Sequence, residues 1–148
     1  RRRPDILFTL PWNSSGNAFG AAGKHYTDGG DGNNGPLSGS ASGHGGLSPW
    51  VVRNTLILWG PDFKRGVTVR IAAGNVDIAP TVLTLKHHNA GETLGGRVLK
   101  EALRDGPDEE QIPSETKILR TGVGRYRVAV QVTDVSRHRY IDKGWRLR

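Results

Sequence analysis

Residues 75 to 85 read Asn75-Val76-Asp77-Ile78-Ala79-Pro80-Thr81-Val82-Leu83-Thr84-Leu85, and they predict a helix from residue 77 to about residue 86. Asp77 is a residue type that favours the N-cap position, and Pro80 falls in the first turn, where a missing N–H costs nothing. Ile78, Val82 and Leu85 recur at helical spacing and therefore share one face. We expect a few strands to precede and flank this helix.

Short apolar or β-branched runs on both sides of this segment predict strands. We expect strands over residues 5–10, 53–59, 67–71, 116–120 and 126–132. Gly122 and Gly124 suit a hairpin turn between the last two, and residues 97–103 predict a short helical turn. The fold class is therefore mixed α/β, loop-rich, with a last third that is mostly antiparallel strand. We treat residues 1–148 as a single partial domain with three regions, 1–50, 51–105 and 106–148.

Composition limits what this chain can be. The hydrophobic fraction is 35% and 21 of the 148 residues are glycine, which is a weak basis for a self-sufficient core. The chain has no cysteine, so neither disulfides nor thiolate metal sites are available. It also has no methionine, and we therefore expect it to be a piece of a longer protein. No run of 18 apolar residues occurs, and we expect no membrane-spanning helix.

The net charge of +7 is concentrated at the end of the chain. Residues 117–148 carry nine Lys or Arg and only two Asp or Glu. A basic end of this kind can contact nucleic acid, an anionic membrane or an acidic protein surface. A solvated face of strands is the simpler interpretation, and we favour it at this point.

His44 is the candidate metal ligand, because it lies between Gly43 and Gly45 in a glycine-rich loop. Glycine neighbours let the backbone turn tightly and leave the imidazole open to approach, which is a common way for a loop to present a zinc ligand. The adjacent His87 and His88 point in different directions in either regular structure, so we interpret them as surface residues. Other acidic candidates carry less weight: Asp28 and Asp31 lie in a glycine-rich loop, but the closing glutamate of a calcium loop is missing.

Several elements in a fixed order carry a resemblance to a known family. They are Pro4-Asp5-Ile6-Leu7, Trp12, Asn17-Ala18-Phe19-Gly20, Gly43-His44-Gly45, Asn54-Thr55-Leu56, Gly60-Pro61-Asp62-Phe63, Gly66, Asn75-Val76-Asp77-Ile78-Ala79-Pro80-Thr81 and Gly96-Arg97-Val98-Leu99. Over nearly its whole length the chain resembles the carboxy-terminal portion of bacterial type I phosphodiesterase/nucleotide pyrophosphatase proteins, which belong to the alkaline phosphatase superfamily. Sulfatases and phosphoglycerate mutases share parts of this pattern.

The resemblance implies a metal-dependent phosphoric ester hydrolase with an alkaline-phosphatase-like sandwich and a phosphate-ester or nucleotide substrate. It implies two metal ions, usually zinc, and a Ser or Thr nucleophile that forms a phospho-enzyme. His44 matches the late Gly-x-His-Gly ligand of that family. The family's earlier Ser-Asp-His-Gly is not matched, since Ser42-Gly43-His44-Gly45 has glycine in place of the carboxylate. The nucleophile and the early ligands would precede Arg1, so we assign no catalytic residue and expect the chain alone to be inactive. The resemblance also suggests an extracellular or periplasmic protein.

Two alternatives stay open beside the hydrolase fragment. The first is a non-catalytic structural or self-assembling module, because an edge strand such as residues 128–132 would offer unpaired backbone groups. The second, less favoured, is a basic nucleic-acid-binding module, suggested by Arg125-Tyr126-Arg127. The chain has no Gly-Lys-Ser/Thr phosphate loop and no Gly-x-Ser-x-Gly nucleophile turn.

Overall fold

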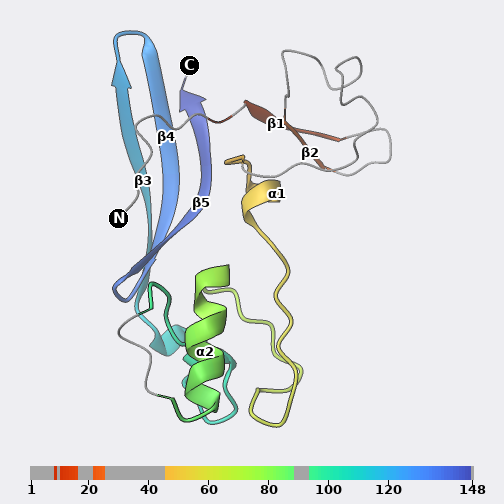
Figure 1. Ribbon diagram of the computed structural model, residues 1–148. Helices are drawn as coiled ribbons and strands as arrows, with labels where there is room; N and C mark the ends of the chain where they lie inside the picture. The colour runs from red at the N-terminus through yellow and green to blue at the C-terminus, as the bar shows by residue number, and fades with distance from the viewer. Residues whose placement is uncertain (1–8, 10, 17–21, 26–45, 89–93, 148) are drawn as a thin grey trace. The chain divides into compact units, whose positions relative to one another are not determined.

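The computed structural model describes residues 9, 11–16, 22–25, 46–88 and 94–147 (Figure 1). Helices and strands follow one another as β1 (Trp12–Gly16), β2 (Ala22–His25), α1 (Pro49–Val52), η1 (Asn75–Asp77), α2 (Ile78–Leu85), η2 (Lys100–Ala102), η3 (Glu109–Gln111), β3 (Ser114–Val123), β4 (Tyr126–Val135) and β5 (His138–Leu147). The chain divides into two compact units. The first holds residues 1–54, 118–131 and 141–148, and the second holds residues 55–117 and 132–140.

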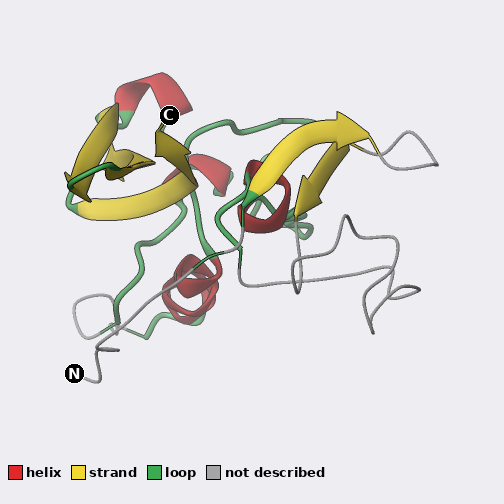
Figure 2. Cartoon of the chain, turned by 90° about the horizontal axis from the view of Figure 1, so that it is seen from above, coloured by secondary structure: helices red, strands yellow, loops and turns green. Residues whose placement is uncertain are grey.

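The last third of the chain is a three-stranded antiparallel sheet with the order β3-β4-β5 (Figure 1), and its strands are among those drawn in yellow in Figure 2. The predicted hairpin is confirmed: β3 and β4 are joined by a two-residue turn, and Gly124 has a φ of 58° at its first position, where a residue with a Cβ would be strained. A second turn at Ser136 and Arg137 leads into β5, with Ser136 at a φ of 52°. The mixture of helices and an antiparallel sheet agrees with a mixed α/β class.

The sheet corrects one expectation about strand edges. Residues 128–132 were predicted to form an exposed edge, but they belong to β4, which is the central strand. The edges are β3 and β5, each ten residues long. The prediction was wrong because β5, which pairs with β4, was not predicted. Charged residues and Gly144 interrupt the apolar pattern of β5, so its sequence does not indicate a strand.

Two predicted strands do not form. Residues 53–59 and 67–71 join no ladder, and the neighbouring chain makes only an isolated antiparallel bridge between Phe63 and Leu103. Beside that bridge, Lys64 N–H donates to the carbonyl of Ala102. A side chain replaces the missing strand partner elsewhere, because the Glu109 carboxylate accepts the backbone N–H groups of Arg70 and Ile71 at 2.5 and 3.3 Å. The β-branched pattern of residues 67–71 therefore did not produce a strand, because β propensity depends on a partner strand.

Helix α2 forms where predicted, but its apolar face does not enter a core. Ile78 and Val82 are 40% and 48% exposed, whereas Pro80 and Thr81 are buried. The helix turns Thr81 inward because its hydroxyl makes hydrogen bonds that an aliphatic side chain at this position could not make. The predicted helical turn near residue 100 is also present, as the 3₁₀ helix η2.

In the first unit, β1 and β2 form an antiparallel pair in which Trp12 lies opposite His25. The Trp12 indole packs edge-on against Trp50 with 5.6 Å between ring centroids, and its Nε1 donates to the carbonyl oxygen of Gly144 at 2.5 Å. The N–H of Gly144 in turn donates to the carbonyl of Leu47 at 2.8 Å. These bonds tie β1 and the segment before α1 to β5.

The described core is small and unusually polar. Its buried apolar residues are Leu99, Ala129, Val132 and Val135, and its buried polar residues are Ser48, Asp77, Thr81, Arg97 and Glu101. Within the part of the chain that the structure describes, no helix has the length and apolar character needed to cross a membrane. The expected strand over residues 5–10, except Thr9, lies outside the described residues.

Candidate functional site

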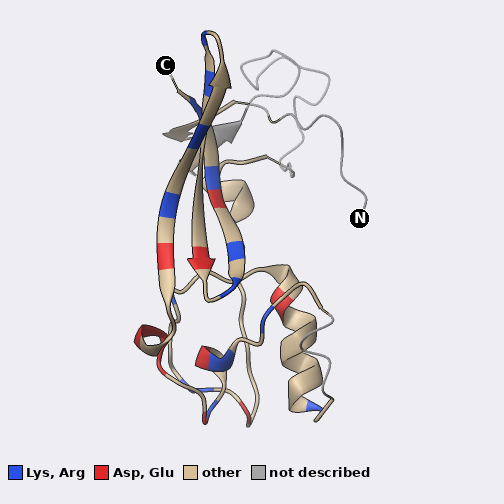
Figure 3. Cartoon of the chain, turned by 90° about the vertical axis from the view of Figure 1, so that its left-hand side faces the viewer, with Lys and Arg blue, Asp and Glu red and all other residues tan. Residues whose placement is uncertain are grey.

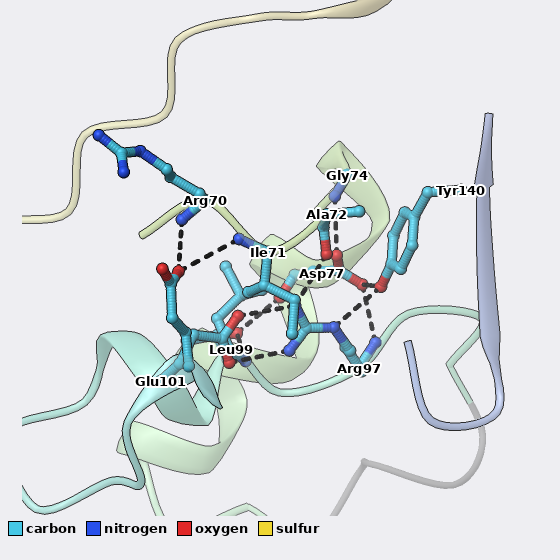
Figure 4. A network of polar contacts seen from close by, with 11 residues as sticks. Arg70, Ile71, Ala72, Gly74, Asp77, Arg97, Leu99, Glu101 and Tyr140 are labelled. Carbon is cyan, nitrogen blue, oxygen red and sulfur yellow. Dashed lines mark hydrogen bonds and ion pairs between the residues drawn. The ribbon is translucent and has the colours of Figure 1, made fainter. Parts of the chain in front are cut away.

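Five side chains of the second unit form a connected buried network, which we call the Arg97 network (Figure 4). Its members are Asp77, Thr81, Arg97, Glu101 and Tyr140. They come from the start of helix α2, from the loop and 3₁₀ helix around residues 97–101, and from strand β5. The network contains the charged side chains that are buried in the described part of the chain, Asp77, Arg97 and Glu101, and it is therefore the first candidate for a functional site.

Arg97 and Glu101 form its central ion pair. Nη1 and Nη2 of the guanidinium donate to the two carboxylate oxygens at 2.8 and 2.7 Å, and the side chains are only 9% and 2% exposed. Nη2 also donates to the carbonyl of Ala72 at 2.9 Å, and Nε donates to the Tyr140 hydroxyl at 3.1 Å. Burial works against the charge of Arg97, but the bond to Glu101, the charge of Glu101 and the contact with Tyr140 outweigh it and raise the pKa of the guanidinium.

Asp77 is fully buried and accepts three hydrogen bonds. Its Oδ1 accepts from the Arg97 N–H at 2.8 Å and from the Tyr140 hydroxyl at 3.0 Å, and its Oδ2 accepts from the Gly74 N–H at 2.8 Å. Asp77 does occupy the N-cap position of α2, but its carboxylate makes no bond to the N–H groups of that helix. The predicted cap is therefore wrong in its chemistry: the carboxylate closes the preceding turn and holds the loop that contains Arg97.

Tyr140 connects the sheet to this group. Its hydroxyl donates to Asp77 and accepts from Arg97, and its ring lies 5.9 Å from the guanidinium carbon. Burial first, and then the hydrogen bond and negative charge of Asp77, raise the pKa of Tyr140 to about 12, although Arg97 offsets part of the effect. No role was predicted for Tyr140 from the sequence, so its part in this network was missed.

Thr81 and Gly96 lie where residues 74–81 contact residues 96–101. The Thr81 hydroxyl donates to the carbonyl of Asp77 at 2.7 Å and accepts from the Leu99 N–H at 3.0 Å. A Cβ at Gly96 would overlap the backbone carbonyl of Val76, so this close approach requires glycine. Asp77 and Thr81 of the first segment therefore hold residues 97 and 99 of the second by hydrogen bonds.

The saturation of these groups decides what the network can do. Both Glu101 oxygens face Arg97, and both Asp77 oxygens already accept from donors. A general base or a metal ligand needs an oxygen that can reach a substrate or an ion. The Arg97 network therefore has the chemistry of a structural frame rather than of a catalytic centre.

The predicted metal ligand, His44, lies outside the described residues, as do Ser42 and the acidic pair Asp28 and Asp31. Within the described residues, no three His, Cys, Asp or Glu side chains gather into a possible metal site. His87 and His88 are exposed, as expected for surface residues. His138 Nδ1 is buried and has no hydrogen-bond partner among the residues that can be placed.

A surface hollow of about 340 Å³ lies near the end of α2, in the same unit. Its lining includes Thr84, Lys100, Arg104 and Asp105. Arg104 and Asp105 are 59% and 87% exposed and lie 3.6 Å apart. Charges of both signs in open water do not select a ligand class, so the hollow adds no second site.

The spacing of Arg97 and Glu101 in the sequence is consistent with their ion pair. Arg97 and Glu101 are four residues apart and flank the apolar residues Val98 and Leu99. Opposite charges at this spacing meet on one side of a helical turn, and apolar neighbours indicate burial.

Comparison with protein-family models, curated proteins and solved structures finds no match for this chain. The family resemblance therefore rests on the sequence elements quoted above.

Replacing Arg97 with methionine should lower the free energy of unfolding by about 3–5 kcal/mol, because it leaves Glu101 buried without its partner. Urea unfolding followed by circular dichroism measures the change. The double variant Arg97→Met/Glu101→Leu should recover most of the loss, since it removes the stranded charge. Arg104→Met is the matched control, since its partner is exposed, and it should cost at most about 1 kcal/mol. Equal losses for Arg97→Met and Arg104→Met would show that the buried pair has no special role.

The substitution Gly96→Ala should lower the free energy of unfolding by about 1–3 kcal/mol, because the added methyl group would collide with the backbone of Val76. Gly95→Ala is the matched control, since an added Cβ there meets nothing within 4 Å. It should be neutral or slightly stabilising. Thermal unfolding of the two variants side by side measures the difference. Equal midpoints of thermal unfolding for Gly96→Ala and Gly95→Ala would contradict the close packing of residues 76 and 96.

Tyr140 should make stability fall with rising pH between about pH 10 and 12. An unfolded tyrosine titrates near pH 10, whereas burial and Asp77 hold the folded pKa at about 12. The folded state therefore binds more protons in this window and loses its advantage as the pH rises through it; below pH 10 the contribution is complete. Urea unfolding at several pH values should show a steeper fall for the wild type than for Tyr140→Phe. Parallel curves for the two proteins would argue against a buried Tyr140 hydroxyl.

Proposed function

We propose that this chain is the carboxy-terminal part of a metal-dependent phosphoric ester hydrolase of the phosphodiesterase/nucleotide pyrophosphatase type. In this proposal His44 supplies one metal ligand and the second unit supplies a rigid frame. The ordered sequence elements support it, from Gly43-His44-Gly45 to Gly96-Arg97-Val98-Leu99. The single observation that carries it is that two of these elements, residues 75–81 and 96–99, meet in the Arg97 network.

That meeting gives the elements a physical reason to occur together. Asp77 accepts the N–H of Arg97, Thr81 accepts the N–H of Leu99, and Gly96 allows the close approach of Val76. Residues that are 18 to 20 positions apart thus depend on one another for the satisfaction of buried groups. A sequence with only some of these residues would leave a buried charge or a clash. This interdependence of residues 75–81 and 96–99 is the support that the proposal draws from the second unit.

The described residues do not offer a place for the metal itself. Both oxygens of the buried Asp77 carboxylate are engaged, and no group of three possible ligands exists in the described part. A zinc pair, when bound, supplies charge stabilisation for the nucleophile and the leaving oxygen. Its remaining ligands and the nucleophile would have to come from elsewhere in the full protein, and we assign no described residue to catalysis.

A second candidate is a self-assembling module, and the exposure of β3 favours it. Nine of the ten residues of this edge strand are exposed, including Ile118, Leu119 and Val123. A long edge with free backbone groups can pair with another chain. Self-association of the isolated chain and hydrolysis by the full protein are compatible, so the two candidates are separated by activity.

The test uses the full-length protein encoded by the gene. Hydrolysis of bis(4-nitrophenyl) phosphate should require added zinc and should fall by at least about 100-fold in kcat/KM on His44→Ala, since even supporting residues of a metal site cost 10–100-fold. His88→Ala, which changes an exposed histidine, is the matched control and should leave the rate unchanged.

The proposal fails if the gene encodes no Ser or Thr nucleophile segment before Arg1, or if hydrolysis ignores His44. A protein without activity that forms larger oligomers as its concentration rises would favour the second candidate instead. Sedimentation velocity at several concentrations detects that outcome. The substitution Leu119→Arg on β3 should then reduce the assembly.

A further inference from the structure

One end of the sheet is strongly basic. In the first unit, residues 118–131 and 141–147 of the hairpin strands carry five basic residues, and Asp142 is their single acid. The basic residues are Arg120, Arg125, Arg127, Lys143 and Arg146. Figure 3 shows basic segments on the strands up to the turn at Gly124 and Arg125. Such an excess creates a positive potential that attracts polyanions.

These charges differ from those in the second unit's part of the same strands. There, Asp134 holds Arg139 at 2.6 Å and Lys117 at 3.2 Å, and Glu115 also pairs with Lys117. Hydrogen bonds from Arg139 lower the pKa of Asp134 to about 2, so these pairs persist across the neutral range. In contrast, none of the five basic residues of the first unit pairs with an acid in the described part of the chain. Their charge is available to a partner.

Aromatic rings lie among these cations. The Arg146 guanidinium carbon is 5.4 Å from the centre of the Tyr126 ring, and Lys143 Nζ is 5.5 Å from the centre of a Trp145 ring. Tyr126 is 58% exposed and follows the hairpin turn directly, with an exposed arginine on each side in the sequence. A ring beside a cation can stack a base while the cation meets a phosphate.

We propose that this surface, the basic tip, binds single-stranded nucleic acid. The basic tip consists of Arg120, Arg125, Tyr126, Arg127, Lys143, Trp145 and Arg146. Its unpaired cations match the phosphate backbone, and the half-open Tyr126 ring matches a base without regard to sequence. An anionic membrane is the competing partner. It would instead bury an aliphatic side chain, and Val123, 86% exposed next to the turn, is the residue that would serve it.

The experiment measures binding of a fluorescein-labelled oligothymidylate to the whole chain by anisotropy, across a series of salt concentrations. Arg125→Ala/Arg127→Ala should weaken binding and lower the slope of log K against log salt by about 1.4, because each lost phosphate contact on a single strand removes about 0.7. Tyr126→Leu should weaken binding by about 5- to 150-fold, the range for one stacked base, without changing the slope. The matched control is Arg65→Ala/Arg137→Ala, which removes two exposed arginines of the second unit and should change neither value.

Several outcomes overturn the proposal. Equal weakening by the control pair would mean that only net charge matters. Undiminished binding by Tyr126→Leu would reduce the surface to an electrostatic patch without stacking. Binding to phosphatidylserine vesicles but not to the oligonucleotide, lost on Val123→Ser, would assign the basic tip to membranes. Circular dichroism of each variant confirms that the fold is intact, and Arg125→Glu/Arg127→Glu provides a second test of the charge contribution that leaves the aromatic rings in place.

Discussion

The burial of the Arg97 guanidinium is the constraint on which the second unit depends. A charge that is 9% exposed is stable only when its donors meet acceptors, and Arg97 meets Glu101, Ala72 and Tyr140. Each acceptor belongs to a different part of the chain: the 3₁₀ helix η2, the segment before α2 and strand β5. One buried cation therefore sets the positions of three segments, and the backbone N–H of Arg97 adds a hydrogen bond to Asp77.

This polar frame replaces part of an apolar core. The described chain buries few large apolar side chains, and Ile78 and Val82 of α2 remain exposed. Replacing a buried ion pair with apolar residues is often neutral or stabilising, so its benefit does not lie in raw stability. Its hydrogen bonds are directional, however, and they specify one arrangement of α2 and residues 96–101 where loose apolar contacts would allow several. In this small, glycine-rich protein, a directional network of this kind defines the fold of the second unit.

The same saturation shapes the functional picture. A frame whose oxygens are all engaged contributes no reacting group, so the hydrolase proposal depends on His44 and on segments beyond those described, with the Arg97 network holding neighbouring elements in place. The basic tip is the opposite case, because its cations have no acidic partner in the described part and one aromatic ring is more than half exposed. Saturated buried groups thus indicate a structural role, whereas the exposed cations without an acidic partner carry the proposed contact surface.

The sequence alone determined the elements that depend on local chemistry. Helical spacing and Pro80 located α2, and alternation with Gly124 located the β3–β4 hairpin, because these signals act between residues a few positions apart. Tertiary structure alone decided which charges are buried. Asp77 meets Arg97 across 20 positions and Tyr140 across 63, distances at which periodicity carries no information. It also decided that residues 67–71 find a glutamate rather than a strand, and that β4 is central, because both depend on partners that local patterns cannot identify.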